Sequence, residues 1–122
     1  MIITDKGHFW ITFDNGYTIS VFNGFGSYSD NHYNTKYISY PKNEKEQIEY
    51  INQRIESKNC EIAIISPEGF LITNDILQSD DTVKGYVSVN ELLEIINIVS
   101  KLKGDKNEWW NKSKNYRTTS NR

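Results

Sequence analysis

Residues 23–34, with the sequence NGFGSYSDNHYN, concentrate side chains that can hold a nucleotide base without reacting with it. The segment contains three aromatic side chains and three asparagines: Phe25, Tyr28, Tyr33, Asn23, Asn31 and Asn34. A base that stacks on an aromatic side chain gains about 1–3 kcal/mol, and an asparagine can read an adenine edge through two hydrogen bonds. A tyrosine-rich loop folded against its neighbouring hairpin would have the same composition, so a purely structural role is an open alternative.

A second segment, VKGYVSVNELLEII at residues 83–96, is suited to an anionic group. Ser88 and Glu91 have the spacing of a capping box, which predicts that a helix begins after Ser88. The free N–H groups at a helix start favour a phosphate, and Lys84 lies just before this start. The loop and this segment together offer aromatic planes, amides and an anion site, a set that fits a nucleotide.

Residue types that would support catalysis are scarce. His8 and His32 are the only histidines, and neither has a partner at metal-ligand spacing. Cys60 is the only cysteine, which excludes a cysteine-based zinc cluster, and its apolar surroundings are typical of a buried structural thiol. His32 acting as a general base with Asp30 is the weaker alternative. We therefore predict a binding protein and not an enzyme, with no catalytic residue, no metal and no cofactor.

Hydrophobic periodicity predicts the strands that position these residues. Alternating side chains indicate a hairpin of strands 8–13 and 17–22, joined at Asn15-Gly16 by a type I′ turn in which both residues have positive φ. Further strands are predicted at 37–40, 60–66 and 70–73, and an irregular acidic segment at 74–83 leads to residues 83–88. The near-continuous apolar run at 60–66 is typical of a central strand.

Two helices complete the predicted fold. Asn43 and Glu46 form a capping box before a helix that extends to about Lys58. The second helix begins after Ser88 and ends at Gly104. The sum is an α+β domain, an antiparallel β-sheet of about four strands with two helices packed on one face.

Length and charge indicate one domain, residues 1–104, followed by a basic tail, residues 105–122. Residues 1–100 carry seven Lys or Arg against fourteen Asp or Glu, a net charge of −7, whereas residues 101–122 carry seven against two, a net charge of +5. Such a tail suggests an anionic partner or an acidic neighbouring subunit, and a solvated tail is an equal alternative. With no apolar run long enough for a signal peptide or a membrane span, we expect a cytoplasmic protein without a membrane partner.

Four motifs, taken in order, resemble a family of phage proteins. NGYTISV, GFGSY, EIAII and VKGYVSVNELLEII fall within about residues 13–100 and resemble the layout of the type-one Thoeris anti-defence proteins. The resemblance implies an antiparallel sheet with helices that assembles into homodimers or larger oligomers in the host bacterial cytoplasm. It also implies a sponge that binds cyclic ADP-ribose isomers made by TIR-domain immune enzymes, and in some members cyclic oligonucleotides, without degrading them. No DNA or RNA partner is expected.

Such a ligand carries two phosphate charges, an adenine and two riboses, so its site needs an aromatic plane, an amide and cationic or N–H donors. We predict the site where the GFGSYSDN loop meets the start of the second helix. The predicted ligand-binding residues are Phe25, Tyr28, Asn31, Arg54, Lys84, Tyr86, Asn90 and Arg117. Because a small domain offers only shallow clefts, a second copy of the chain is expected to complete the site. The alternative function is a phage inhibitor that binds a host defence protein through the acidic body and the Trp109-Trp110 tail.

Overall fold

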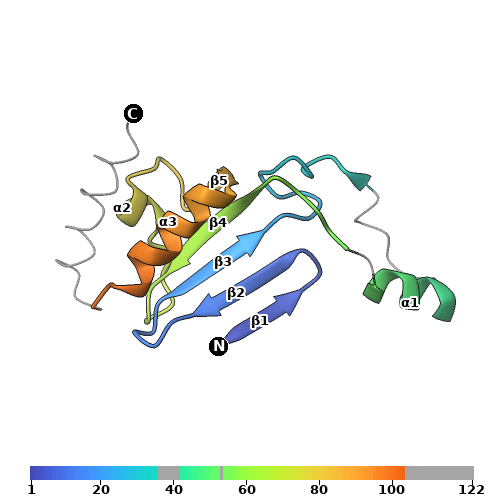
Figure 1. Ribbon diagram of the computed structural model, residues 1–122, viewed down its shortest axis with the longest axis horizontal. Coiled ribbons are helices and arrows are strands. Elements are labelled where there is room, and N and C mark those ends of the chain that lie inside the picture. The colour runs from blue at the N-terminus through green and yellow to red at the C-terminus, as the bar shows by residue number, and fades with distance from the viewer. Residues whose placement is uncertain (36–41, 53, 104–122) are drawn as a thin grey trace.

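The computed structural model describes residues 1–35, 42–52 and 54–103, without the side chain of Ile51, and confirms the α+β fold class (Figure 1). Five strands form one antiparallel sheet in chain order: β1 (Ile2–Asp5), β2 (His8–Thr12), β3 (Thr18–Phe22), β4 (Asn59–Ile65) and β5 (Lys84–Ser88). The helices in this part of the chain are α1 (Glu44–Asn52), α2 (Thr73–Leu77) and α3 (Val89–Ser100). None of these helices is long and apolar enough to cross a membrane.

The predicted β2–β3 hairpin is confirmed, but its predicted type I′ turn is wrong. Gly16 has a φ of 88°, whereas Asn15 is not among the described residues with positive φ. Gly16 N donates to Phe13 O and Phe13 N donates to Tyr17 O, both at 2.9 Å, which is the pattern of a three-residue loop with a single left-handed residue. A two-residue turn with positive φ at both positions, Lys6 (25°) and Gly7 (79°), instead joins β2 to β1, a strand that was not predicted.

Helix α1 begins as predicted but lies elsewhere. Asn43 Oδ1 accepts a hydrogen bond from Glu46 N at 2.9 Å, which confirms the cap. The helix ends at Asn52 and not near Lys58, and it lies beyond one end of the sheet, so its predicted packing on the sheet face is wrong (Figure 1). The ammonium of Lys6, 4.0 Å from the centroid of the Tyr50 ring, connects α1 to the β1–β2 turn.

The segment after β4 also departs from prediction. The expected strand at 70–73 is reduced to an isolated bridge between Leu71 and Ile65. Ile64 N donates to the Thr73 hydroxyl at 2.7 Å, and Thr73 starts α2, which occupies the first half of the segment predicted to be irregular. Residues 70–73 therefore stay bonded to the end of β4, where Ile72 N also donates to Ile64 O at 2.9 Å, and the chain then enters α2.

The hydrophobic core lies between the sheet and the two helices that cover it, α2 and α3. Its fully buried members come from β3, β4, β5 and both helices: Ile19, Ile62, Ile64, Val87, Ile76, Ile95 and Val99. The predicted cap of α3 is confirmed, since Ser88 Oγ accepts from Glu91 N at 3.2 Å. Cys60 is buried here as expected, and burial raises the pKa of its thiol to about 11. The predictions for residues 37–40, for Gly104 and for the tail lie outside the described residues.

Candidate functional site

The fold brings the aromatic loop, residues 23–35, against strand β5. Tyr86 N donates to Tyr28 O at 2.8 Å, and Tyr28 N donates to a carboxylate oxygen of Glu61 on β4 at 3.1 Å. A side chain at Gly85 would collide with the loop, because a Cβ atom there would lie 2.6 Å from Tyr28 Cβ. The glycine in the KGYVS motif therefore allows the close approach that joins the two predicted halves of the site.

Buried polar side chains give the loop its shape. Ser27 Oγ lies 2.6 Å from both Gly24 O and Ser29 Oγ. The Asn31 carboxamide donates to Asn23 O and Glu56 O, each at 2.8 Å, and Asn31 is buried. Asn31 thus holds the loop together instead of pointing outward with Tyr28.

Tyr86 has an unusual backbone conformation. Between the register pairs Cys60–Val87 and Ile62–Lys84, the strand β5 contains one residue more than β4, so a β-bulge forms at Gly85 and Tyr86. Tyr86 has a φ of 52°, a left-handed conformation that costs free energy for a bulky residue. The bulge leaves the side chain 57% exposed, and bulges next to binding sites commonly re-aim a side chain in this way.

A short aromatic row extends from Tyr28 along the loop. Tyr28 is 48% exposed and stacks on His32 with ring centroids 5.5 Å apart and an angle of 9° between the planes. The His32 and Tyr33 rings are nearly perpendicular, with centroids 4.4 Å apart, and His32 Nδ1 lies 3.0 Å from Ser27 O. The Asp30 carboxylate accepts instead from Asn59 Nδ2 at 3.1 Å, so the geometry does not pair Asp30 with His32 as a general base.

The predicted cations are less available to bind a ligand than the aromatic side chains. Lys84 Nζ lies 2.9 Å from a Glu91 carboxylate oxygen, at the start of α3 where Asn90 is exposed. The exposed Arg54 guanidinium pairs with Glu56 at 3.2 Å. Arg117 lies outside the described residues. Lys84 and Asn90 are therefore near Tyr86 in the sequence. Of the predicted cations, Lys84 and Arg54 each have an acidic partner.

Two residues that hold the aromatic loop in place, Glu61 and Asn59, were not predicted. Each binds the backbone of the loop: Glu61 accepts from Tyr28 N, and Asn59 Oδ1 accepts from Asp30 N at 2.8 Å. Both sit on β4, about thirty residues after the loop. No local pattern in the sequence indicates these contacts, because they depend on how the loop crosses the end of the sheet.

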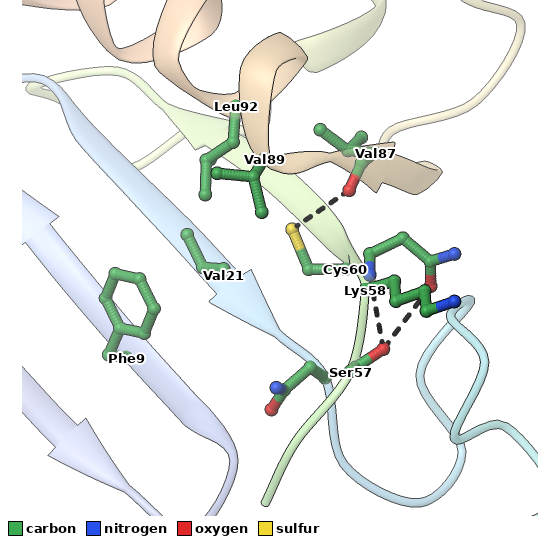
Figure 2. A pocket seen from close by; sticks show the side chains of 10 residues that line it. Phe9, Val21, Ser57, Lys58, Cys60, Val87, Val89 and Leu92 are labelled. Atoms are coloured by element: carbon green, nitrogen blue, oxygen red, sulfur yellow. Dashed lines mark hydrogen bonds between the residues drawn. The ribbon is translucent and has the colours of Figure 1, made fainter.

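A small hollow lies on the helix-covered face of the sheet, as Figure 2 shows. Its volume is about 150 Å³, and its apolar lining comes from β2, β3, β5 and the start of α3: Phe9, Val21, Val87, Val89 and Leu92. The Cys60 thiol donates to Val87 O at 3.7 Å, and its raised pKa disfavours the reactive thiolate. The hollow could accept an apolar group of about the size of benzene but is too small for a nucleotide.

The opposite face carries a histidine–serine pair. His8 Nε2 lies 2.5 Å from Ser20 Oγ, and the His8 ring stacks with Trp10 and Phe22 at centroid distances of 3.9 and 5.1 Å. Burial lowers the pKa of His8, although Glu61 and Asp5 act in the opposite direction. Nucleophilic catalysis would also need oxyanion donors. Strands β2 and β3 each have a paired strand on both sides, so their N–H groups are engaged in the sheet.

In residues 1–35, 42–52 and 54–103, no three His, Cys, Asp or Glu side chains are grouped so that they could hold a metal ion. Compared with known proteins, the chain matches no protein-family model, no curated protein and no solved structure.

Proposed function

We propose that the protein is a sponge that binds a cyclic nucleotide signal of the cyclic ADP-ribose type at the surface formed by Tyr28, Lys84, Tyr86 and Asn90, and releases it unchanged. The observation that carries the proposal is Tyr86, a bulky residue held at a φ of 52° with its ring exposed. Backbone strain of this kind persists where the surrounding structure maintains it, often at binding sites. Here the Tyr86–Tyr28 backbone bond maintains it and sets two exposed tyrosines on adjoining segments.

The side chains at this surface suit binding better than bond cleavage. Tyrosines supply stacking planes, and Asn90 supplies a carboxamide that can donate and accept hydrogen bonds. The phosphate donor is Lys84, whose ammonium leaves Glu91 for the ligand phosphate, with Arg54 and Arg117 as further donors. Exchange of one anion for another keeps the charge of Lys84 compensated in both states.

Coverage of the ligand requires more than one copy of the chain. Tyr28 and Tyr86 are 48% and 57% exposed, whereas ligand sites usually bury about 70–90% of a small molecule. We therefore propose that a second copy covers this surface in a homodimer or larger oligomer that works in the host bacterial cytoplasm.

Recovery of the bound ligand tests whether the protein leaves it chemically unchanged. The protein is incubated with an excess of a cyclic ADP-ribose isomer, separated from free ligand, and heated to denature it. A sponge depletes the free pool in proportion to its own concentration and returns the intact isomer on heating. Appearance of a linear product would show an enzyme, and an undiminished free pool for every isomer and for cyclic oligonucleotides would refute the proposal.

A second candidate function is a phage inhibitor that binds a host defence protein. It is favoured by Val89 and Leu93, two exposed apolar side chains one turn apart on α3. This function predicts that Leu93→Lys abolishes protection of the phage while nucleotide binding is absent in the wild type. The sponge predicts that Leu93→Lys retains nucleotide binding.

A further inference from the structure

The two edges of the sheet differ: the β5 edge is covered, and the β1 edge is open among the described residues. At the β5 edge, the loop from residue 23 to 35 binds the strand through Tyr86 N and Tyr28 O, and the bulge at Gly85 bends it. Covering loops and bulges are means by which proteins keep an edge strand from pairing with another chain. At the β1 edge, no element of the described residues pairs with the outer side of Ile2–Asp5 (Figure 1).

The hydrogen bonds between β1 and β2 show which backbone groups face this open edge. Met1 and Thr12 form two reciprocal backbone hydrogen bonds: Thr12 N donates to Met1 O at 2.9 Å, and Met1 N donates to Thr12 O at 3.0 Å. In an antiparallel pair such positions alternate with positions whose N–H and C=O point the other way. Ile2 and Thr4 therefore direct their N–H and C=O groups outward.

The side chains of β1 do not protect the edge either. Ile2 is 70% exposed and Ile3 is 47% exposed. The strand contains no lysine and no proline, the residues that most often block an edge. An open edge with exposed β-branched side chains is suited to pairing with another strand.

We propose that β1 pairs antiparallel with β1 of a second copy of this chain, with Ile3 of one copy directly opposite Ile3 of the other. Ile2 of each copy then faces Thr4 of the other copy, and four backbone hydrogen bonds use all the outward groups of both residues. The two isoleucines form a pair without mutual hydrogen bonds, in which side chains approach most closely. The contact has two-fold symmetry, which closes the dimer.

Neighbouring registers are less favourable. Centring the pair on Ile2 sets Ile3 opposite Met1 and so separates the two Ile3 side chains. Centring it on Thr4 sets Asp5 opposite Ile3 and requires a strand conformation at Lys6, whose φ is 25°. Centring the pair on Ile3 thus pairs the outward groups of Ile2 and Thr4 and brings the two Ile3 side chains together, without a strand conformation at Lys6.

The paired copies form one sheet of ten strands, five from each. The tyrosine surfaces lie at β5, the far edge of each copy, so this contact neither completes nor blocks them. The inference therefore does not rest on the proposed function, and a variant that loses one property is expected to keep the other.

Disulfide formation tests the register. Ile3→Cys is expected to form a covalent dimer under mild oxidation, because Cα atoms at such a position are about 4.5 Å apart and lie within disulfide range. Thr4→Cys is the matched control, since its symmetry mate is about 8 Å away, given about 3.3 Å per residue along a strand and about 4.8 Å between strands. The native Cys60 is buried and does not interfere. Equal cross-linking of both variants, or none with Ile3→Cys, would overturn the register.

Sedimentation tests the interface itself. The wild type is expected to sediment as a dimer or larger assembly, and Ile3→Lys as a smaller species, because like charges directly opposite each other destabilise a strand pair. Leu93→Lys, an equivalent change of an exposed apolar residue on α3, is expected to sediment as the wild type. A monomeric wild type, or dissociation by Leu93→Lys and not by Ile3→Lys, contradicts the proposal. Retained nucleotide binding by Ile3→Lys would separate this interface from the ligand site.

Discussion

The side chain of Asn15 joins the β2–β3 hairpin to the end of α3. Its Nδ2 donates to Val99 O at 2.9 Å and to Leu102 O at 2.7 Å, and its Oδ1 accepts from Tyr17 N at 3.1 Å. Carbonyl groups at a helix end need such donors, because they have no partner within the helix. One carboxamide therefore fixes both the hairpin turn and the position of α3.

Loss of this carboxamide is expected to destabilise the fold. Asn15→Ala removes three hydrogen bonds and should lower the free energy of unfolding by about 2–3 kcal/mol, measured by urea denaturation. Asn90→Ala is the control, because this residue is exposed on the first turn of α3 and an exposed substitution should change stability by less than about 0.5 kcal/mol. An equal effect of the two variants would contradict the role of Asn15.

His8 predicts how stability depends on pH. Burial lowers the pKa of His8 in the folded state, so the unfolded chain binds a proton more readily. The contribution of His8 to the free energy of unfolding is therefore expected to be fully present above the ordinary histidine pKa of about 6.5. It should fall as the pH drops through that value toward the lower pKa of the folded state. Thermal melting of the wild type and His8→Gln at several pH values measures the effect. An identical pH dependence of the two proteins would show that His8 makes no contribution.

At the scale of elements, contact between the loop and β5 depends on the absence of a side chain at residue 85. In Gly85→Ala the new Cβ atom would meet Tyr28 Cβ at 2.6 Å, so the loop must shift and the two tyrosines separate. We expect at least tenfold weaker nucleotide binding, measured by calorimetric titration. Gly26→Ala is the control, since Gly26 lies in the same loop with positive φ and no atom within 4 Å of the added Cβ. It should lower stability modestly and leave affinity nearly unchanged.

Elements with a strong local signal were predictable from sequence. The hairpin at 8–22, the caps at Asn43 and Ser88 and the apolar strand β4 all follow from short-range patterns, although β4 is an internal strand and β3 is the central one. The errors occur where long-range contacts decide. Asn15 was expected at positive φ, but α3 engages its side chain in another turn. Residues 70–73 read as a strand, yet the Thr73 hydroxyl binds Ile64 N and starts α2.

The candidate site shows the same division at the scale of the whole molecule. The sequence predicted that Tyr28 and Tyr86 both belong to this site, and a backbone hydrogen bond joins them although they are far apart in the chain. The sequence could not indicate that the Asn31 side chain donates hydrogen bonds within the loop and to Glu56 O, or that Glu91 pairs with Lys84. Those facts depend on how the loop folds on itself and on the bulge in β5.

Calorimetric titration of wild type, Tyr86→Ala and Tyr33→Ala with cyclic ADP-ribose isomers tests the central claim most directly. Tyr33 is a matched control, because it lies on the same loop, is 85% exposed and packs its ring against His32. Loss of one stacked base should cost about 2 kcal/mol, so Tyr86→Ala is expected to raise Kd about thirtyfold while Tyr33→Ala stays near the wild-type value. Absence of binding by the wild type to any isomer, or equal affinity of all three proteins, would contradict the account.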